Sequence, residues 1–208
     1  IKEYEHKEDV IKEAALSYIG KEKIGTTAVL CYKKNTCNEV NIEIRNLKKE
    51  EGTISSEIIT TINGKEYAEN DKIIFLQNDK KLNIKNGMTG IILGGNEDIL
   101  KIRTEDNRDI EINTNKYDKI DYGYAITLHK SQGKTYDNVT IVAEKMMDAK
   151  ATYVAMTRHR ENVEMLYSKE EFSSFKMLTN EISKIKQKDL IVDYENIQNE
   201  NKTRVLKY

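Results

Sequence analysis

The spacing of apolar residues near the start of the chain predicts a helix, a buried strand and a second helix. Residues 7–19 place apolar side chains at positions i, i+1, i+4, i+5 and i+8, as in an amphipathic helix, and Gly20 is expected to end it. Residues 26–32 are apolar and β-branched, as in a buried strand. A second helix, capped by Asn35 or Thr36, is expected to follow.

Short apolar runs alternate with turn-forming residues between residues 54 and 120. The runs lie at 72–76, 88–93, 99–103 and 109–112, and pairs such as Asn-Gly and Gly-Gly separate them. Strands at this spacing predict a small antiparallel barrel. Because α/β segments flank it on both sides, we interpret the barrel as an insertion.

The α/β pattern returns after the barrel. Strands are expected at 124–127, 139–143 and 163–167, and helices at 148–160 and about 168–188. The apolar stripe of the last helix is expected to consist of Phe172, Phe175, Leu178, Ile182 and Ile185. The polar stretch from Val192 to Tyr208 is expected to fray.

Composition limits the classes of function. The 208 residues are 38% hydrophobic and 33% charged, with a formal net charge of -1. A dedicated nucleic-acid-binding module is usually basic, so any DNA contact would need a local patch. No apolar run approaches the roughly 18 residues of a membrane span, so no membrane partner is expected. Cys31 and Cys37 have no metal-binding spacing and indicate a reducing cytoplasm. The start at Ile1, without Met or a signal-peptide pattern, indicates a piece of a longer protein.

The densest polar stretch runs from residue 124 to residue 136, immediately behind a predicted strand. Thr127, His129 and Ser131 alternate there, so on an extended chain their side chains would point the same way. Such a row of donors suits a nucleic-acid backbone, which is bound through many contacts that do not depend on base sequence. A polar strand end facing solvent is the alternative interpretation.

Gly133-Lys134-Thr135 imitates the end of a phosphate-binding loop of the form GxxxxGK[ST]. The first glycine of that motif would have to stand at position 128, which is Leu128. The preceding segment therefore lacks the backbone freedom to wrap phosphates, and we reject a phosphate-binding loop here.

A second dense stretch places Arg158 and Arg160 directly after an apolar, helix-like segment. One interpretation is structural, with both arginines in salt bridges to Glu161 or Glu164. The other is an arginine that contacts the γ-phosphate of a nucleotide, where its planar fork stabilises spread negative charge. Residue types alone do not choose between them.

Together, residues 125–133 and 153–158 resemble motifs V and VI of superfamily 1 DNA helicases. The His-Lys-Ser-Gln-Gly form of the first is typical of the RecD-like, 5′-to-3′ branch. Within that branch, residues 146–148, 153–163 and 188–194 are similar to the helicase part of Ti-type conjugative relaxases of the TraA kind.

The resemblance implies an α/β fold, namely the second RecA-like domain of a helicase, with a parallel sheet and flanking helices. Residues 1–63 and 121–208 would form this domain, and an SH3-like β-barrel would be inserted at 64–120. The parent protein would be an ATP-dependent DNA helicase and a relaxase that acts with ATP and Mg²⁺.

The resemblance also implies site residues. Single-stranded DNA would be contacted by Thr127, His129, Lys130, Ser131 and Gln132. The nucleotide would be contacted by Gly133, Arg160 and Arg158, with Arg158 as the catalytic arginine finger. Weaker candidates for DNA contact are Lys33, Lys34 and Asn35 near the first strand, and Lys80, Lys81, Lys85 and Asn86 in the barrel.

Several helicase features are absent from the sequence. It has no phosphate-binding loop, no acidic Mg²⁺ motif and no relaxase histidine cluster. In this family ATP lies between two RecA-like domains, so this chain would supply one wall of the site and the missing first domain the other. We therefore expect no cofactor and no ATP hydrolysis in this chain alone. A non-catalytic module that docks nucleic acid or protein is the alternative.

Overall fold

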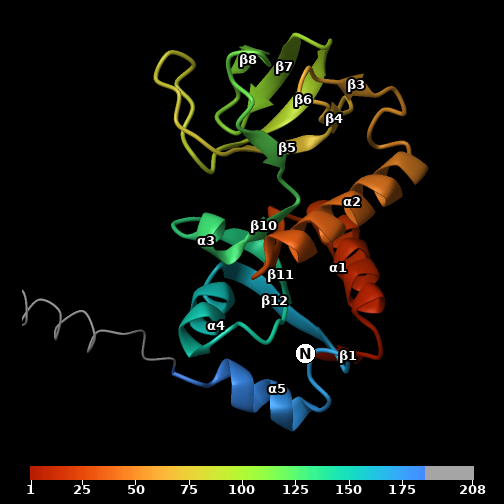
Figure 1. Ribbon diagram of the computed structural model, residues 1–208, viewed down its shortest axis with the longest axis vertical. Coiled ribbons are helices and arrows are strands. Elements are labelled where there is room, and N and C mark those ends of the chain that lie inside the picture. Colours follow the sequence, from red (N-terminus) through yellow and green to blue (C-terminus); the bar gives the residue numbers. More distant parts are fainter. Residues whose placement is uncertain (186–208) are drawn as a thin grey trace, which may run out of the picture.

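A five-stranded parallel sheet organises the lower part of the molecule in Figure 1, seen in a computed structural model that describes residues 1–185. The strand order is β1-β12-β11-β2-β10, and every neighbouring pair is parallel. The strands are β1 (Lys2–Tyr4), β2 (Thr27–Cys31), β10 (Ala125–Thr127), β11 (Tyr136–Val142) and β12 (His159–Ser168).

Helices cover both faces of this sheet (Figure 1). In β2, Val29 and Cys31 pack toward α1 (Lys7–Glu22) and α2 (Lys34–Glu50), whereas Ala28 and Leu30 pack toward α4 (Ala149–Met156) and α5 (Phe175–Ile182). Successive side chains of a strand point to opposite faces, so a strand covered on both sides must be apolar throughout. The predicted parallel sheet with flanking helices is confirmed.

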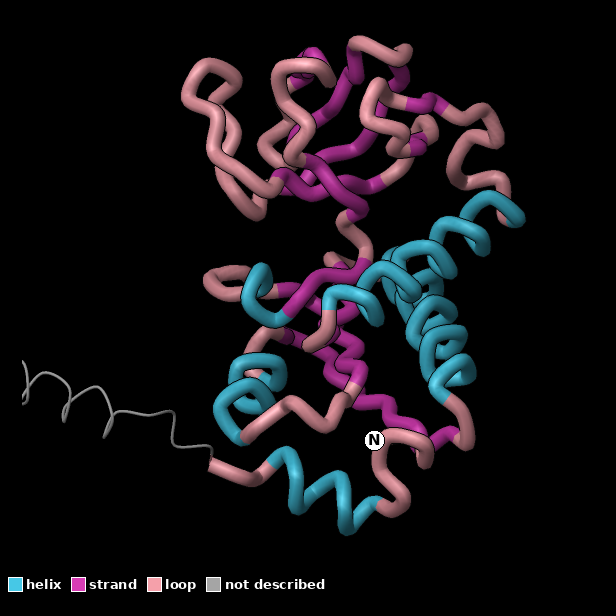
Figure 2. The backbone as a smooth tube through the Cα atoms, in the orientation of Figure 1, coloured by secondary structure: helices cyan, strands magenta, loops and turns pink. Residues whose placement is uncertain are grey.

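The residues between α2 and β10 form a separate antiparallel sheet with its own core, the upper part of Figure 2. Its strand order is β8-β7-β6-β5-β9, and a short hairpin precedes it. Its buried core includes Tyr67, Phe75, Ile92 and Ile102. The strands are β3 (Ile59–Thr60), β4 (Glu66–Tyr67), β5 (Lys72–Phe75), β6 (Thr89–Gly95), β7 (Ile99–Thr104), β8 (Asp109–Asn113) and β9 (Ile120–Tyr122). The predicted antiparallel strands are confirmed.

A buried carboxylate fastens the two sheets where the chain passes between them. Asp71, just before β5, is fully buried and accepts two hydrogen bonds from Arg45 Nε (2.9 and 3.2 Å) and one from Arg45 Nη2 (2.8 Å). It also accepts the hydroxyl of Tyr124 at 2.9 Å and the backbone N–H of Ala68 at 2.7 Å. Helix α2, the entry to the inserted sheet and the exit from it therefore meet at one side chain.

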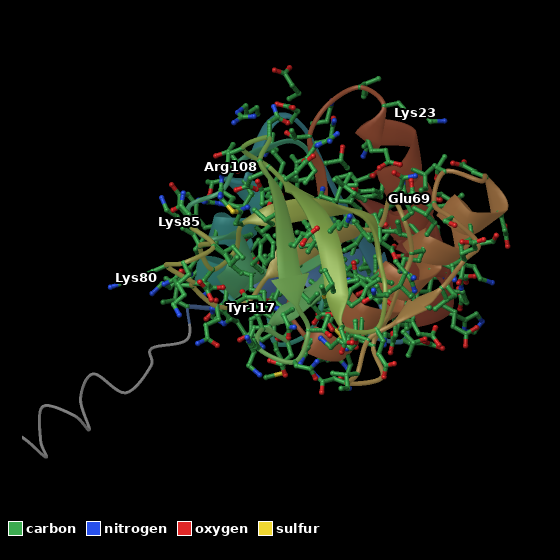
Figure 3. The ribbon with its side chains drawn as sticks, turned by 90° about the horizontal axis from the view of Figure 1, so that it is seen from above. Lys23, Glu69, Lys80, Lys85, Arg108 and Tyr117 are labelled. Atoms are coloured by element: carbon green, nitrogen blue, oxygen red, sulfur yellow. The ribbon has the colours of Figure 1, made fainter. Side chains whose placement is uncertain are left out.

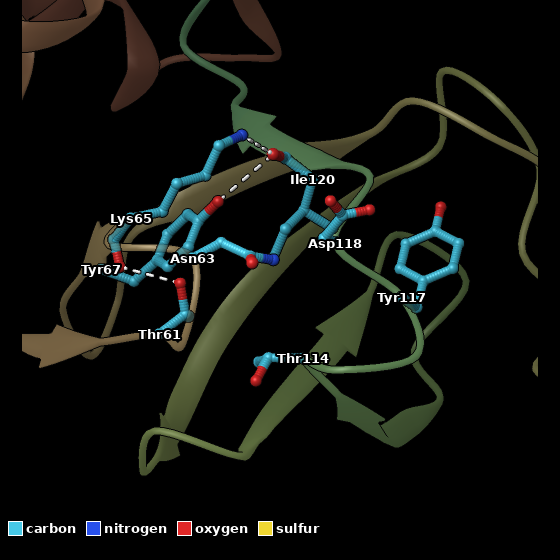
Figure 4. Close-up of a pocket in the computed structure, with 8 residues that line it drawn as sticks. All are labelled: Thr61, Asn63, Lys65, Tyr67, Thr114, Tyr117, Asp118 and Ile120. Atoms are coloured by element: carbon cyan, nitrogen blue, oxygen red, sulfur yellow. Dashed lines mark hydrogen bonds between the residues drawn. The ribbon is translucent and has the colours of Figure 1, made fainter.

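A hollow of about 40 Å³ lies between the β3–β4 hairpin and β9 (Figure 4). Lys65 Nζ and Tyr67 Oη both donate to the backbone carbonyl of Ile120, at 2.6 and 3.3 Å. These bonds fasten the hairpin to the sheet. The hollow has room for water but not for a nucleotide.

Two helix boundaries differ from the sequence prediction in the first α/β segment. Gly20 does not end α1, which continues to Glu22. Helix α2 begins at Lys34, so Asn35 and Thr36 lie inside it, and Lys33 at the N-cap position makes no side-chain capping bond. The hydroxyl of Thr36 donates to the buried Glu144 at 2.8 Å.

The later helices are shorter than predicted. Helix α4 ends at Met156, and His159 already begins β12. Helix α5 covers only Phe175–Ile182. Two residues of its predicted apolar stripe lie outside it: Phe172 is buried in the core from the preceding turn, and Ile185 is 84% exposed. The predicted frayed end and the 188–194 similarity lie outside the described residues.

Candidate functional site

The polar stretch after β10 is a helical turn and not an extended strand. Helix α3 covers Leu128–Ser131, so the prediction that Thr127, His129 and Ser131 point the same way is wrong. The side chain of Leu128 is buried in the core, and its packing there stabilises the helical turn. Ser131 is fully buried, and its hydroxyl donates to the carbonyl of Leu128 at 2.7 Å.

The remaining candidates for DNA contact reach the surface around this turn. His129 and Gln132 are exposed, and Thr127 and Lys130 are half-buried. Gly133 follows with a φ of 80°, a left-handed conformation that favours glycine, and turns the chain toward β11. The structure thus brings four of the five proposed DNA-contacting side chains to one accessible turn.

Lys134 ties the end of this stretch to the inserted sheet. Its ammonium lies 3.1 Å from Glu105 Oε2, in the turn between β7 and β8. Glu105 also accepts the backbone N–H and the hydroxyl of Thr89, at 3.0 and 2.6 Å. Burial opposes ionisation of Glu105, but the hydrogen bonds from Thr89 and Lys134 lower its pKa.

Arg158 lies against the end of the same stretch. Its guanidinium donates to the carbonyl of Val154 at 3.0 Å, to the carbonyl of Lys134 at 3.3 Å and to the hydroxyl of Thr157 at 3.2 Å. Within residues 1–185, no carboxylate is in ion-pair distance of it, so the predicted alternative of a salt bridge to Glu161 or Glu164 is wrong. Among the described residues, its guanidinium therefore contacts carbonyl and hydroxyl dipoles and no carboxylate.

Arg160 differs, because its charge is paired. Its Nη1 lies 2.9 Å from Asp137 Oδ1, at the start of β11. The other oxygen of Asp137 accepts the backbone N–H and the hydroxyl of Thr26, at 2.8 and 2.7 Å. The hydrogen bonds from Thr26 and Arg160 lower the pKa of Asp137 to about 2. No local sequence pattern predicts this pair, which forms because β11 and β12 are neighbours.

Tyr32, which the sequence analysis did not single out, lies beside His129. The ring centroids are 6.4 Å apart and the rings are tilted by 55°. Tyr32 follows directly after β2, and His129 follows β10, the next strand of the sheet. Its signal in the sequence is an aromatic residue immediately after a buried strand. Of the weaker candidates nearby, Lys33 lies 3.6 Å from Glu144 and 3.4 Å from Glu171, and Lys34 and Asn35 are exposed.

The basic loop between β5 and β6 lies on the same side of the molecule as α3 (Figure 1), and Figure 3 shows Lys80 and Lys85 pointing outward from it. Arg108, in the turn between β7 and β8, donates to the carbonyls of Leu82 and Asn83, at 3.1 and 3.0 Å, and so holds the loop in place. The exposed side chains of the loop include Lys80, Lys81, Lys85 and Asn86.

In the described part of the chain, no three His, Cys, Asp or Glu side chains are grouped to hold a metal ion. Residues 1–185 also contain no helix long and apolar enough to cross a membrane.

Known proteins resemble this chain over most of its length. A family model described as the viral superfamily 1 RNA helicase core domain matches residues 26–166. The conjugal transfer protein TraA of Rhizobium radiobacter is 33% identical over 178 residues, which are 83% of this chain and 16% of TraA. The RecBCD enzyme subunit RecD of Mycobacterium tuberculosis is 26% identical over 100 residues, which are 46% of this chain and 17% of RecD.

The fold also matches a solved helicase. Pif1 helicase from Bacteroides, in complex with ADP-AlF3 and ssDNA, aligns with a TM-score of 0.58 at 19% identity, over 92% of this chain and 49% of that one. The chain thus spans only 16% of TraA and 17% of RecD. It belongs to the family of superfamily 1 helicase core domains, in the RecD-like branch that includes TraA.

Proposed function

We propose that this chain is the second RecA-like domain of an ATP-dependent 5′-to-3′ DNA helicase of a conjugative relaxase. In that enzyme it supplies the motif V contact to single-stranded DNA and the motif VI arginine finger. The observation that carries the proposal is the position of Arg158, which has no carboxylate partner among residues 1–185. Its Nη1 donates at 3.3 Å to the carbonyl of Lys134, just after the stretch that contains His129.

The DNA contact is assigned to the accessible turn after β10. Thr127, His129, Lys130 and Gln132 offer donors that suit a phosphate backbone, which is bound without reading base sequence. The hydroxyl of Ser131 is used inside the turn, so its part is to hold α3 in shape. The exposed lysines of the β5–β6 loop add positive charge on the same side.

The nucleotide contact is assigned to Arg158. In the whole enzyme, ATP and Mg²⁺ would lie between this domain and the missing first RecA-like domain. The planar guanidinium would then stabilise charge on the γ-phosphate, as arginine fingers do. Gly133 would let the loop approach the nucleotide. Arg160 is the weaker candidate for nucleotide contact, because Asp137 already balances its charge. The chain alone lacks the residues that hold the phosphates and Mg²⁺, so it is not catalytic by itself.

We assign the strands from β3 to β9 to an inserted SH3-like barrel and the flanking described residues to the RecA-like domain. The bounds expected from the sequence, 64–120, are too narrow, because β3 (Ile59–Thr60) pairs with β4 and β9 continues to Tyr122 beside β5. The support is the strand order of the inserted sheet. Its last strand, β9, lies beside its first, β5, and β6, β7 and β8 follow as a meander. A small five-stranded barrel of the SH3 type has this arrangement.

The alternative, a non-catalytic docking module, predicts that Arg158 is consumed in a local salt bridge. Among residues 1–185 the guanidinium of Arg158 contacts carbonyls and a hydroxyl instead. An uncompensated arginine beside a polar turn favours an anionic ligand, and the helicase function is therefore the better supported one.

The test is DNA-stimulated ATP hydrolysis by the parent protein. We expect Arg158→Ala to lower kcat by about 10³-fold or more, because arginine fingers contribute on this scale. Arg158→Lys should not restore kcat, since lysine keeps the positive charge but lacks the planar guanidinium fork. The exposed Lys150 on α4 provides the control Lys150→Ala, which should leave kcat unchanged. ATP turnover by this chain alone that Arg158→Ala abolishes would contradict the proposal.

A further inference from the structure

Two aromatic rings from neighbouring strands meet at the carboxyl edge of the parallel sheet. Tyr32 is the first residue after β2, and His129 lies on α3, which follows β10. Strands β2 and β10 are paired in parallel. Their ring centroids are 6.4 Å apart with a tilt of 55°. The tilt leaves an angled aromatic surface, because the two ring faces are not coplanar.

Tyr32 is held firmly at its backbone and at one side of its ring. Its backbone N–H donates to Glu144 Oε2 at 2.8 Å, and Glu144 is itself 4% exposed. Its ring packs against the core between the sheet and α4. The residue is therefore fixed by its surroundings, and it is half-buried, not fully enclosed.

The polar atoms of the two rings are not used within the protein. Among residues 1–185, neither the hydroxyl of Tyr32 nor a ring nitrogen of His129 has a hydrogen-bond partner. His159, by contrast, lies 2.6 Å from the carbonyl of Met156 through its Nδ1. The structure thus gives no internal reason for the exposed His129 ring to stand beside Tyr32.

We propose that Tyr32 and His129 form a stacking platform for a base of the single strand, an inference that rests on the proposed function. Every base has a π face, so stacking on aromatic side chains contributes to binding without selecting a sequence. The base would lie on the face of one ring and meet the edge of the other, the arrangement that aromatic pairs prefer. Thr127, Lys130 and Gln132 would contact the phosphates on either side. Tyr32 is then a DNA-binding residue that contacts a base and not a phosphate.

The test compares two single strands that differ only in their bases. Binding of this chain is measured by fluorescence anisotropy to a labelled oligothymidine and to an oligomer of equal length whose sites are abasic. We expect the oligothymidine to bind roughly fivefold more tightly or better, since stacking on one aromatic residue has about that effect. Tyr32→Leu, which keeps apolar contact with the core, should remove this difference, and Tyr32→Phe should preserve it.

The outcomes separate the platform from the proposed function. Equal affinity of the unaltered chain for both oligomers, with salt-sensitive binding, overturns the platform and leaves the phosphate contact intact. An affinity ratio that Tyr32→Leu leaves unchanged overturns it as well, provided that the variant unfolds at the same temperature as the parent. His129→Gln, at an exposed position, gives a second measure of the ratio that does not disturb the core. Binding to neither oligomer contradicts the proposed function, and the platform falls with it.

Discussion

Glu164 shows how a single carboxylate can hold several elements of the parallel sheet together. On β12 it accepts hydrogen bonds from Ser17 and Lys21 on α1 and from Thr140 on β11, and Lys2 Nζ lies 3.2 Å from its other oxygen. Burial opposes its ionisation, but the bonds from Lys21, Ser17 and Lys2 lower its pKa to about 2. The charged form is therefore the one that stabilises the fold.

This pKa predicts the pH dependence of stability. A carboxyl whose pKa is lowered on folding stabilises the protein fully above its unfolded pKa, near 4.5, and loses that contribution as the pH falls toward 2. We expect Glu164→Gln to lower the free energy of unfolding at pH 7, with a difference that shrinks between pH 4.5 and 2. Urea unfolding across this range measures it, and Glu161→Gln, at an exposed position, is the control. A difference that is constant with pH would contradict this assignment.

The two arginines after α4 show where prediction from sequence stops at the residue scale. Residue types alone make Arg158 and Arg160 equal candidates for nucleotide contact. The difference comes from Asp137, which the parallel pairing of β11 and β12 brings to Arg160. Asp137 is distant from Arg160 in the sequence, so no local sequence pattern predicts that the two side chains pair.

At the scale of elements, Asp71 is the joint between α2, the inserted sheet and β10. Asp71→Asn would leave the guanidinium of Arg45, which is 7% exposed, buried without its charge partner. We expect a loss of about 3–5 kcal/mol in the free energy of unfolding, the usual effect of breaking a buried ion pair. Asp109→Asn breaks the exposed pair with Arg103 and should leave the unfolding temperature unchanged. Equal losses of stability in the two variants would show that Asp71 does not hold α2, the inserted sheet and β10 together.

The β5–β6 loop is the element whose contribution to DNA binding is simplest to isolate. Lys80→Glu combined with Lys81→Glu should weaken single-stranded DNA binding and reduce its salt dependence, because cations that contact phosphates release counterions. The control is Lys116→Glu, an exposed lysine between β8 and β9. If the double substitution leaves both binding and unwinding by the parent protein unchanged, the loop is a solvated basic turn and does not contact DNA.

Element predictions succeeded where packing dictates a pattern and failed where it does not. The strands were predictable because a strand buried on both faces must be apolar, as in β2. Helix α3 was not, because an alternation of three polar residues also fits a turn whose apolar Leu128 is drawn into the core. Helix α5 is shorter than its apolar stripe because Phe172 reaches the core from a turn.

For the whole molecule, the two sheets are connected at several points, one of which is the bond from Lys72 Nζ on β5 to the carbonyl of Thr27 on β2 at 3.3 Å. Asp71 joins them at the chain crossings, and the ion pair between Lys134 and Glu105 joins them beside the candidate site. The carbonyl of Lys134 in turn accepts Arg158. The inserted sheet, the turn after β10 and Arg158 are thus in continuous contact, which suits the proposed link between DNA contact and nucleotide chemistry.

The turn after β10 is the proposed contact with single-stranded DNA. The most direct measurement is fluorescence anisotropy of a labelled single strand with this chain at low and moderate salt, with Thr127→Ala and His129→Ala beside the unaltered chain. We predict binding that weakens as salt rises, because phosphates are contacted. It should be lost in both variants, because Thr127 would contact a phosphate and the His129 ring a base. Absence of binding at any salt, or binding that neither substitution changes, would contradict the claim. A longer protein that includes the first RecA-like domain would then show whether that domain carries the contact.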